Sequence, residues 1–381
     1  MKKFLLITMV VLLVMTTMVS CTVAETPTGK PITKDNIKIG AIFLGESSVA
    51  ASESGAQAFQ LDEARKAAGI ADTQIIKKDN VTAQSFEGDV YSLVESGCRL
   101  IMVYSNSFDE LVEKAAKDYP GIYFAVENGK ASTLANVKTY SAKLYQAQYL
   151  SGICAGLNAE TNKIGFIAVE GASETQNEIN AFAKGVYAVN KDAVVFVEYI
   201  KTDTYEASFN AAKTLIEEKE CGVIAQNCFS EGAVEKAKAS EKFFCGYYRD
   251  MLDLGPLQNL TSAVMNTKTF IEGALNAIFN NTWTAFDKTS LTIVNAGVDV
   301  KLNPSKIDYK TTKLIEAVKV KLVDGSIQIF DNLNIKVTFG AEDEVPAVEV
   351  AEEVLTNNEG TGVALDKAVN SEWLYRNVEA K

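Results

Sequence analysis

Polar side chains that could bind a small molecule end several apolar segments of the chain. Asn227 closes the segment GVIAQN, Asn106 directly follows LIMVYS, and Asp250 follows FFCGYY after a single arginine. A side-chain amide donates and accepts at once, which suits the edge of a nucleobase, and a carboxylate can accept two sugar hydroxyls. The pattern therefore predicts a site for a polar organic solute.

Two phenylalanines lie two positions beyond the asparagines. Phe108 follows Asn106 and Phe229 follows Asn227 with this spacing. An aromatic face stacks on a planar base with roughly 1–3 kcal/mol per base, so both rings are candidates for the site. Each candidate also has a purely structural interpretation. The phenylalanines can pack in the core, asparagine is common in turns, and Asp250 can cap a helix or pair with the arginine before it.

The composition does not indicate catalysis or metal binding. The chain of 381 residues contains no histidine, which removes histidine-based triads, histidine-ligated zinc and the usual general base at neutral pH. The cysteines form no CxxC pair, so neither a cysteine-only zinc site nor a disulfide framework is expected. We therefore expect no cofactor and no metal. Catalysis by carboxylates, as in a glycosidase, remains the weakest alternative.

Apolar segments with the character of strands alternate with amphipathic segments along the chain. LIMVYS (100–105) precedes a helical pattern at 109–119, and KIGFIAVEG (163–171) precedes one at 179–189. Short apolar strands that alternate with helices form βαβ units and parallel sheets. Further strands are expected at 37–43, 122–128, 193–200, 222–227, 243–248, 261–266, 291–302 and 326–330, and helices at 58–68, 144–157, 209–219, 232–240, 270–280 and 312–322.

The series of elements has two similar halves. They begin with IKIGAI at 37–42 and NKIGFI at 162–167. We therefore predict an α/β fold of two doubly wound parallel-sheet lobes joined by a hinge. The expected boundaries are 36–143 for the first lobe with 256–288 returning to it, 144–255 for the second lobe with 289–339 completing it, and 340–381 for an acidic extension. The extension can add a strand and a helix or remain a solvated appendage.

Loops at the carboxyl ends of the predicted strands locate the site. In open α/β sheets ligands bind beyond these ends, where loops and helix N-termini present free N–H groups. The loops are 45–48, 105–108 and 127–128 in the first half, and Glu170, 227–229 and 249–250 in the second. The candidate ligand contacts among them are Glu46, Ser47, Asn106, Phe108, Glu170, Asn227, Phe229 and Asp250.

The N-terminal segment has the pattern of an export signal. Lys2 and Lys3 precede an apolar run at 4–14, which is short against the roughly 20 residues of a membrane-spanning helix. The run leads to MVSC at 18–21, which resembles the lipobox of bacterial lipoproteins. A secreted protein without a lipid is the alternative interpretation.

The lipobox resemblance implies how the protein is attached to the membrane. It implies a signal peptide at 1–20, a diacylated Cys21 and a flexible tether at 21–35. The protein would then lie on the extracytoplasmic side of the cell membrane, held by its lipid. The net charge of -12 argues against a nucleic-acid partner, which would require basic stripes, and against attachment to anionic lipid by charge.

A longer part of the chain resembles the basic membrane lipoprotein (BMP) family. The stretch YQAQYLSGICAGLNAETNKIGFIAVEG at 145–171 is similar to the segment that joins the two lobes in that family. Three further stretches are similar to it: INAFAKGVYAVNKDAVV (179–195), AAKTLIEEKECGVIAQN (211–227) and FFCGYYRDM (243–251). The resemblance extends over about residues 37–330 and implies the type I periplasmic-binding-protein fold.

Members of the BMP family are substrate-binding lipoproteins of ABC importers that take purine nucleosides or related bases. The resemblance therefore implies a monomer that captures such a solute between its lobes, catalyses no reaction and delivers the solute to a permease and its ATPase. It also implies that Asp250 binds the ribose, because the family has an aspartate at this place. The alternatives are a sensor or surface interaction protein with the same fold, and a binder of a different solute such as a sugar.

One departure from the family concerns the loop after the first strand. Family members have a Gly/Asp-rich turn followed by an aromatic residue that stacks on the base. Here LGESSVAASESGAQAF, at 44–59, is longer and has no aromatic residue before Phe59. Phe59 is therefore the candidate for the stacking ring, with a core-facing position as its structural alternative.

Overall fold

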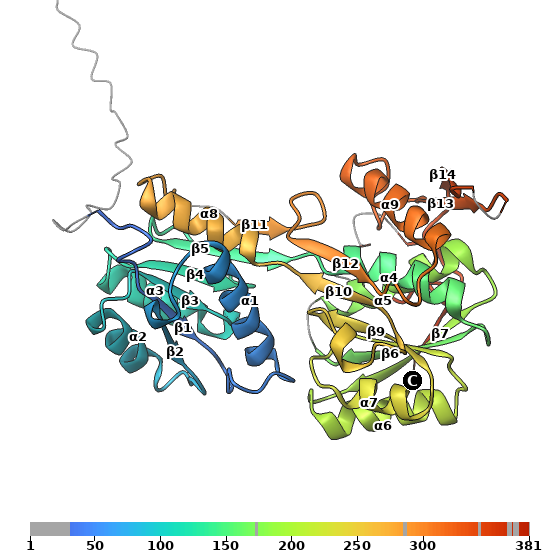
Figure 1. Ribbon diagram of the computed structural model, residues 1–381, viewed down its shortest axis with the longest axis horizontal. Coiled ribbons are helices and arrows are strands. Elements are labelled where there is room, and N and C mark those ends of the chain that lie inside the picture. Colours follow the sequence, from blue (N-terminus) through green and yellow to red (C-terminus); the bar gives the residue numbers. More distant parts are fainter. Residues whose placement is uncertain are drawn as a thin grey trace, which may run out of the picture.

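The computed structural model describes residues 31–171, 174–284, 288–341, 344–363, 368 and 373–380. The predicted signal peptide and lipobox, with Cys21, lie outside these residues. The described chain forms two lobes, each a sheet with helices on both faces (Figure 1). No helix in the described ranges is long and apolar enough to cross a membrane.

A six-stranded parallel sheet forms the first lobe, in the order β11-β5-β4-β3-β1-β2. Its central strands are buried along their length, as in a sheet covered on both faces. The strands are β1 (Ile39–Ile42), β2 (Ile75–Lys78), β3 (Leu100–Val103), β4 (Tyr123–Glu127), β5 (Val137–Ala142) and β11 (Lys288–Leu291). One face is covered by α1 (Glu53–Ala67) and α8 (Lys268–Phe279), and the other by α2 (Phe86–Glu95) and α3 (Asp109–Asp118).

A seven-stranded sheet forms the second lobe, in the order β12-β10-β9-β8-β6-β7-β15, and only β10 and β12 pair antiparallel in it. The strands are β6 (Lys163–Val169), β7 (Val194–Ile200), β8 (Val223–Gln226), β9 (Phe243–Tyr248), β10 (Asn259–Met265), β12 (Val298–Leu302) and β15 (Val378–Ala380). One face is covered by α4 (Tyr145–Asn158), α5 (Thr175–Val189) and α9 (Tyr309–Val323), and the other by α6 (Tyr205–Glu217) and α7 (Gly232–Ala239). Single turns of 3₁₀-helix, η1 (Asp72–Gln74), η2 (Asn106–Phe108) and η3 (Leu252–Leu254), lie in the connections.

Glycines allow α4 and α5 to approach each other closely. A Cβ atom at Gly152 would lie 2.1 Å from the carbonyl oxygen of Phe182, and one at Gly185 would lie 2.0 Å from that of Tyr149. These distances are far below van der Waals contact, so a side chain at either position would push the helices apart. The helix layer on this face of the second lobe therefore depends on the two glycines.

The chain passes between the lobes after β5, after β10 and between β11 and β12. The connecting segments are bonded to one another. Lys143 N donates to Leu291 O at 2.8 Å, and Asn266 N donates to Gly297 O at 2.9 Å. Segments that cross side by side in this way form the hinge of two-lobed proteins, which agrees with the predicted architecture (Figure 1).

The boundaries of the lobes differ in part from the prediction. We predicted that residues 256–288 return to the first lobe, but β10 pairs with β9 in the second sheet, so the return begins with α8. We predicted that residues from 289 onward complete the second lobe, but β11 pairs with β5 in the first sheet. The single strand predicted at 291–302 is therefore two strands, because the chain crosses the hinge at 292–297.

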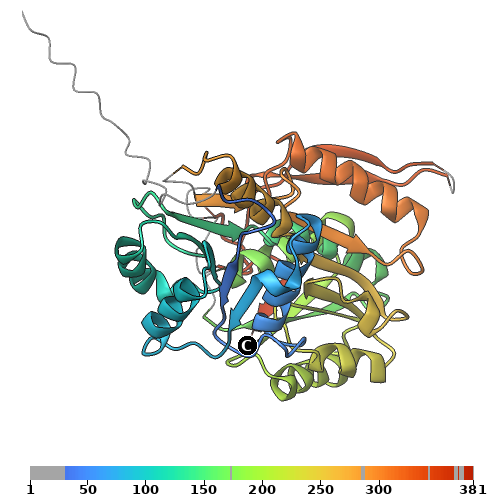
Figure 2. The ribbon, with the colours of Figure 1, turned by 60° about the vertical axis from the view of Figure 1, so that its left-hand side comes forward.

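The acidic extension packs against the second lobe where the structure describes it. The strands β13 (Leu333–Thr338) and β14 (Ala347–Glu352) form an antiparallel hairpin, and β15 adds to the sheet beside β7. Leu355 and Tyr375 are fully buried. The described residues of the extension therefore add strands, as one alternative had it, but none of them forms the expected helix. The hairpin of β13 and β14 lies at the top right of the molecule (Figure 2). The strand predicted at 326–330 is wrong, since turns bury its isoleucines without pairing them.

Candidate functional site

The carboxyl ends of β4 and β9 bring the two lobes into contact. The hydroxyl of Tyr248, the last residue of β9, donates to the carboxylate of Glu127, the last residue of β4, at 3.2 Å. Tyr248 adopts a left-handed backbone conformation with φ 66°, which is uncommon for an aromatic residue. Such backbone strain is concentrated at functional sites, where the surrounding structure holds the side chain in place.

Glu127 is a buried carboxylate, and the described groups that donate to it are neutral. Tyr140 donates its hydroxyl to Glu127 at 2.9 Å, and the amide of Gln57, on α1, donates at 3.4 Å. The side chain is nearly inaccessible to solvent, and this burial raises the pKa of Glu127 although the three donors oppose the shift. The hydroxyl of Tyr104 is buried close to this carboxylate and has no hydrogen-bond partner among the described residues.

Glu53 lies at the start of α1, directly after Ser52, whose side chain caps the helix by accepting from Gly55 N at 3.0 Å. Solvent reaches its side chain, yet crowding by protein raises the pKa of Glu53 to about 7. The negative charges of Glu127 and of Asp203, from the second lobe, add to the shift. Because solvent still has access, we attribute the shift to partial desolvation together with like charges.

The second lobe contributes an aromatic ring and another carboxylate. Asp203 accepts hydrogen bonds from the backbone amides of Phe229 at 2.6 Å and Ser230 at 3.1 Å. These bonds fix the loop after β8, and the half-buried ring of Phe229 packs edge-on against Tyr247 and Tyr248 with centroid distances of 5.6 and 5.0 Å. The ring of Phe229 therefore lies beside the residue that links the lobes.

A second buried carboxylate lies behind this ring. Glu178, on α5, accepts the hydroxyl of Tyr247 at 3.1 Å. Burial raises the pKa of Glu178 to about 8, while hydrogen bonds from Asn227 and Tyr247 oppose the shift. Asn227 is itself held in place, because its Oδ1 accepts Val169 N at 2.8 Å and its amide donates to Thr175 at 3.1 Å.

We refer to these residues together as the interlobe cluster: Glu53, Gln57, Tyr104, Glu127, Tyr140, Glu178, Asp203, Phe229, Tyr247 and Tyr248. Within the described ranges, no group of three or more metal-ligating side chains is found. The cluster offers carboxylate acceptors, tyrosine hydroxyls and one half-exposed aromatic ring. These groups can orient a polar organic solute by hydrogen bonds and stacking.

The structure places two of the predicted ligand residues at the cluster and assigns a third to the core. Phe229 belongs to the cluster, and Asn227 contacts it through Glu178. Phe108 does not lie at the surface of the site: its ring is buried and stacks on Phe86 at 4.9 Å. Phe108 is therefore a core residue between the sheet and the helices α2 and α3, as its structural interpretation had it.

The other predicted residues lie on exposed loops or helices around these strand ends. Asp250 accepts Leu252 N at 3.0 Å but is not the N-cap of η3, which is Met251, and its neighbour Arg249 forms ion pairs with Glu231 and Asp253. Glu46 accepts from Ser48 and Asn80, and Phe59 is 52% exposed on α1. The remaining predicted residues are Ser47, Asn106 and Glu170. Their role in binding stays a prediction, and the core-facing alternative for Phe59 is wrong.

Several residues of the cluster were not among the predicted contacts. Tyr104 and Tyr248 belong to the segments LIMVYS and FFCGYY, where they counted as apolar strand residues although both stand at the strand ends. Glu127 was located only as part of a loop. Glu53 and Gln57 lie on the first helix, and only the helix start, with its serine cap, could have indicated that this face reaches the site.

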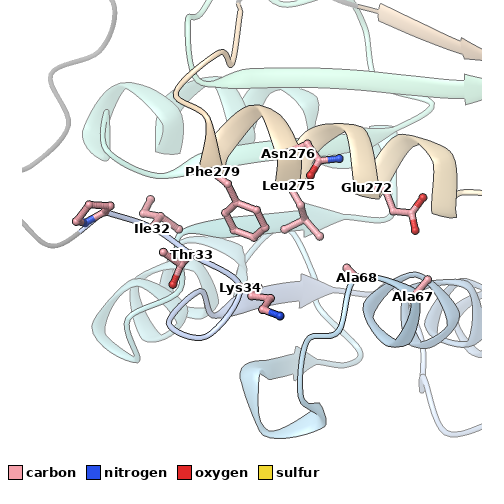
Figure 3. Close-up of a pocket in the computed structure, with 10 residues that line it drawn as sticks. Ile32, Thr33, Lys34, Ala67, Ala68, Glu272, Leu275, Asn276 and Phe279 are labelled. Carbon is pink, nitrogen blue, oxygen red and sulfur yellow. The ribbon is translucent and has the colours of Figure 1, made fainter.

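A pocket of the described chain lies elsewhere in the first lobe. It measures about 440 Å³ and lies between residues 31–34, the end of α1 and the side chains of Leu275 and Phe279 on α8 (Figure 3). Lys34 precedes β1, so this pocket lies at the amino ends of the strands, opposite the edge where α/β sheets bind ligands. We therefore assign the site to the interlobe cluster.

Comparison with known proteins identifies the family. Residues 46–332 match the family described as ABC transporter substrate-binding protein PnrA-like (Bmp). The putative ABC transporter glucose-binding protein TsgA13 of Haloferax volcanii is 32% identical over 172 residues, 45% of this chain and 43% of that protein, so the match spans less than half of that relative. The ABC transporter nucleoside-binding protein BmpA of Lactococcus lactis subsp. cremoris is 20% identical, with 65% of this chain and 76% of that protein covered.

A solved structure has the same fold. The ABC transporter solute-binding protein from Conexibacter woesei superposes with a TM-score of 0.65 and 17% identity, covering 77% of this chain and 98% of that one. The fold is that of type I periplasmic-binding proteins, as the resemblance implied. The family comprises binding proteins rather than enzymes, and it acts on the extracytoplasmic side. The chain therefore belongs to the PnrA-like family of ABC transporter substrate-binding proteins, and it is a solute-binding protein of an ABC transporter.

Proposed function

We propose that the protein captures a purine nucleoside or a related nucleobase between its lobes and delivers it to an ABC permease. The observation that supports this most directly is the interlobe cluster, in which the strand ends of both lobes meet through Tyr248 and Glu127. Ligands of open α/β sheets bind beyond such strand ends. Hinge motion about the three connections would open and close the lobes around the solute.

The nucleoside is supported by the types of groups in and near the cluster. The half-exposed ring of Phe229 can stack on a planar base. Asp250 follows β9, and with one carboxylate oxygen engaged by Leu252 N its other oxygen can accept a ribose hydroxyl. The relative BmpA is described as nucleoside-binding. We also propose that the protein acts as a monomer held to the membrane by a diacylated Cys21.

A sugar is the second candidate, and two observations favour it. The relative TsgA13 is described as glucose-binding. In addition, the first lobe lacks a ring at the start of α1, and Gly55 cannot be replaced by one, because a Cβ atom there would lie 1.9 Å from the carbonyl oxygen of Val49. On this loop and helix, Phe59 is the ring left for a second stacking contact, and the residue is 52% exposed.

The thermal unfolding of the full chain in mild detergent tests this function. A ligand at about 100 times its dissociation constant adds about 2.7 kcal/mol to the free energy of unfolding, which raises the melting temperature by a few degrees. We expect such a shift with inosine, guanosine or adenosine and none with amino acids. Asp250→Ala should abolish the shift. Asp192→Ala should retain it, because Asp192 is exposed and precedes β7, at the amino ends of the strands in the same sheet. A shift with glucose alone would select the second candidate.

A further inference from the structure

The interlobe cluster gathers four acidic side chains from both lobes. Glu53 and Glu127 come from the first lobe, and Asp203 and Glu178 come from the second. Among the described residues, no lysine or arginine acts on the pKa of Glu53, Glu127 or Glu178. The donors that reach these carboxylates are tyrosine hydroxyls, side-chain amides and backbone N–H groups.

Among the described contacts, one of these carboxylates stays free to meet a solute. Glu178 is buried and accepts from Tyr247 and Asn227. Glu127 is buried and its oxygens accept from Gln57, Tyr140 and Tyr248. Asp203 has both oxygens engaged by backbone amides. Glu53 is solvent-exposed and receives only a long contact of 3.4 Å from Gln57. The acceptor that a solute can reach is therefore Glu53, with Glu127 and Asp203 close enough to act on it through their charge.

A second group of the cluster lacks a partner. The hydroxyl of Tyr104 is buried near Glu127, with only 2% of the residue exposed, and has no hydrogen-bond partner in the described part of the chain. A buried hydroxyl without a partner carries an energetic penalty that a bound polar group can remove. Gln57 connects the two positions, because its amide contacts both Glu53 and Glu127 and donates to the carbonyl oxygen of Tyr104 at 3.2 Å.

We propose that the solute presents a hydrogen-bond donor, a hydroxyl or an amino group, to Glu53, and that this cluster of acids makes the protein reject anionic solutes, above all phosphate esters. The inference rests on the proposed function and names the charge class of the solute. A neutral or cationic donor satisfies Glu53, whereas a phosphate would bring its negative charge close to Glu53, Glu127 and Asp203, with which no lysine or arginine of the described residues forms an ion pair.

The same arrangement links binding to a proton. Crowding and like charges hold the pKa of Glu53 at about 7, so the group is partly protonated at neutral pH. A donor from the solute stabilises the ionised form, lowers the pKa and releases the proton on binding. The release is therefore largest near pH 7 and disappears near pH 9, where Glu53 is ionised before the solute arrives.

Titration calorimetry on the full chain tests the inference with three pairs of probes: guanosine and its 5′-monophosphate, adenosine and its 5′-monophosphate, and glucose and glucose 6-phosphate. We expect the wild-type protein to bind one neutral member at least 100-fold more tightly than its phosphate. Glu53→Gln should weaken the neutral solute by about 10-fold, as expected for the loss of a charged hydrogen bond, and reduce the preference over the phosphate by 10-fold or more. Titrations in phosphate and Tris buffers should show proton release that Glu53→Gln removes.

The matched control is Glu63→Gln, on the same helix, where Glu63 is exposed and paired with Lys66 at 3.1 Å. This variant should keep the affinity, the preference and the proton release of the wild type. A phosphate ester that binds as tightly as its neutral parent would overturn the inference and leave solute capture intact. So would an unchanged preference in Glu53→Gln. If no member of these pairs binds, the proposed function fails and the inference with it.

Discussion

The interlobe cluster and the attachment of the C-terminal extension both bury carboxylates, but they balance the negative charge differently. In the extension, Glu353 accepts from Asn334 at 3.1 Å and from Tyr375, and it forms an ion pair with Lys191. Lys184 lies buried nearby, where its ammonium group donates to backbone carbonyls. Burial lowers the pKa of Lys184, and the negative charge of Glu353 opposes this shift. The chain thus supplies the cations for its own acid.

The interlobe cluster has the opposite balance. In the part of the chain that the structure describes, the donors to Glu127 and Glu178 are neutral, and burial raises the pKa of each. A carboxylate that is neutralised by its own chain serves the fold, because breaking the pair leaves an uncompensated charge. A carboxylate that lacks a cation where two lobes meet can serve a solute that enters between them. The comparison therefore separates a structural network from a binding network by charge balance rather than by burial.

The largest effect is expected from breaking the network of the extension. Glu353→Ala should lower the free energy of unfolding by about 3 kcal/mol, since it leaves Lys184, Lys191 and the hydroxyl of Tyr375 without their acid. Urea denaturation measures the change. Glu352 is the preceding residue and is exposed, so Glu352→Ala should change the free energy of unfolding by less than about 0.5 kcal/mol. Equal effects of the two substitutions would mean that Glu353 does not hold the extension.

The next effect concerns the pH dependence of the interlobe cluster. Burial holds the pKa of Glu178 at about 8 in the folded protein, above the ordinary value of 4.5. The folded state therefore binds more protons than the unfolded state between these values, so the free energy of unfolding falls as pH rises from 5 to 8. For this one group the slope approaches about 1.4 kcal/mol per pH unit.

Glu178→Gln should remove this contribution and flatten the profile. The glutamine oxygen can still accept the hydroxyl of Tyr247, so the packing is retained. Urea denaturation at pH 5, 6.5 and 8 measures the slope in the wild type, in the variant and in the surface control Glu160→Gln, which should follow the wild type. A variant as pH-sensitive as the wild type would show that Glu178 is not the protonated group.

A smaller effect distinguishes the two tyrosines that bond Glu127. Tyr140→Phe removes a donor within the first lobe, and Tyr248→Phe removes the donor from the second lobe. Each should lower the free energy of unfolding by about 1 kcal/mol. Only Tyr248→Phe should also increase the radius of gyration without solute, as measured by small-angle scattering, because it alone releases the contact between lobes. The same increase in Tyr140→Phe would show that the bond to Tyr248 does not restrain the lobes.

The sequence predicts most of the fold because each strand and helix carries its own local signal. The apolar segments before Asn106 and Asn227 become β3 and β8. The KIG segment at 163–165 begins β6, and the one at 38–40 begins one residue before β1. The prediction fails at 291–302 because a crossing between lobes leaves no mark in a pattern that continues on both sides. It fails at β2, whose half-exposed residues IIKK lack the apolar run of a central strand.

The site is less predictable because its residues depend on contacts between lobes. Phe108 and Phe229 have the same spacing from an asparagine, yet one stacks in the core and the other packs at the junction of the lobes. The difference depends on which side of the sheet the residue after the strand faces. A single sequence does not predict the direction in which a loop turns. Glu53 and Tyr248 become partners of one cluster only through the approach of two lobes that are encoded far apart in the chain.

The smallest effect on stability is expected for Tyr104→Phe. Together with Tyr149→Phe, it compares the two networks by the loss of one tyrosine hydroxyl in each. The hydroxyl of Tyr104 has no partner among the described residues, so its removal should change the free energy of unfolding by less than about 0.5 kcal/mol. Tyr149→Phe removes a hydroxyl that donates to Asn334 at 2.7 Å in the network of the extension, and it should lower stability by about 1–2 kcal/mol. Urea denaturation measures both. Binding reverses the order, because Tyr104→Phe should weaken the solute several-fold and Tyr149→Phe should not. A Tyr104→Phe variant with wild-type affinity would place that hydroxyl with the structural residues and restrict the binding network to Glu53 and the groups around it.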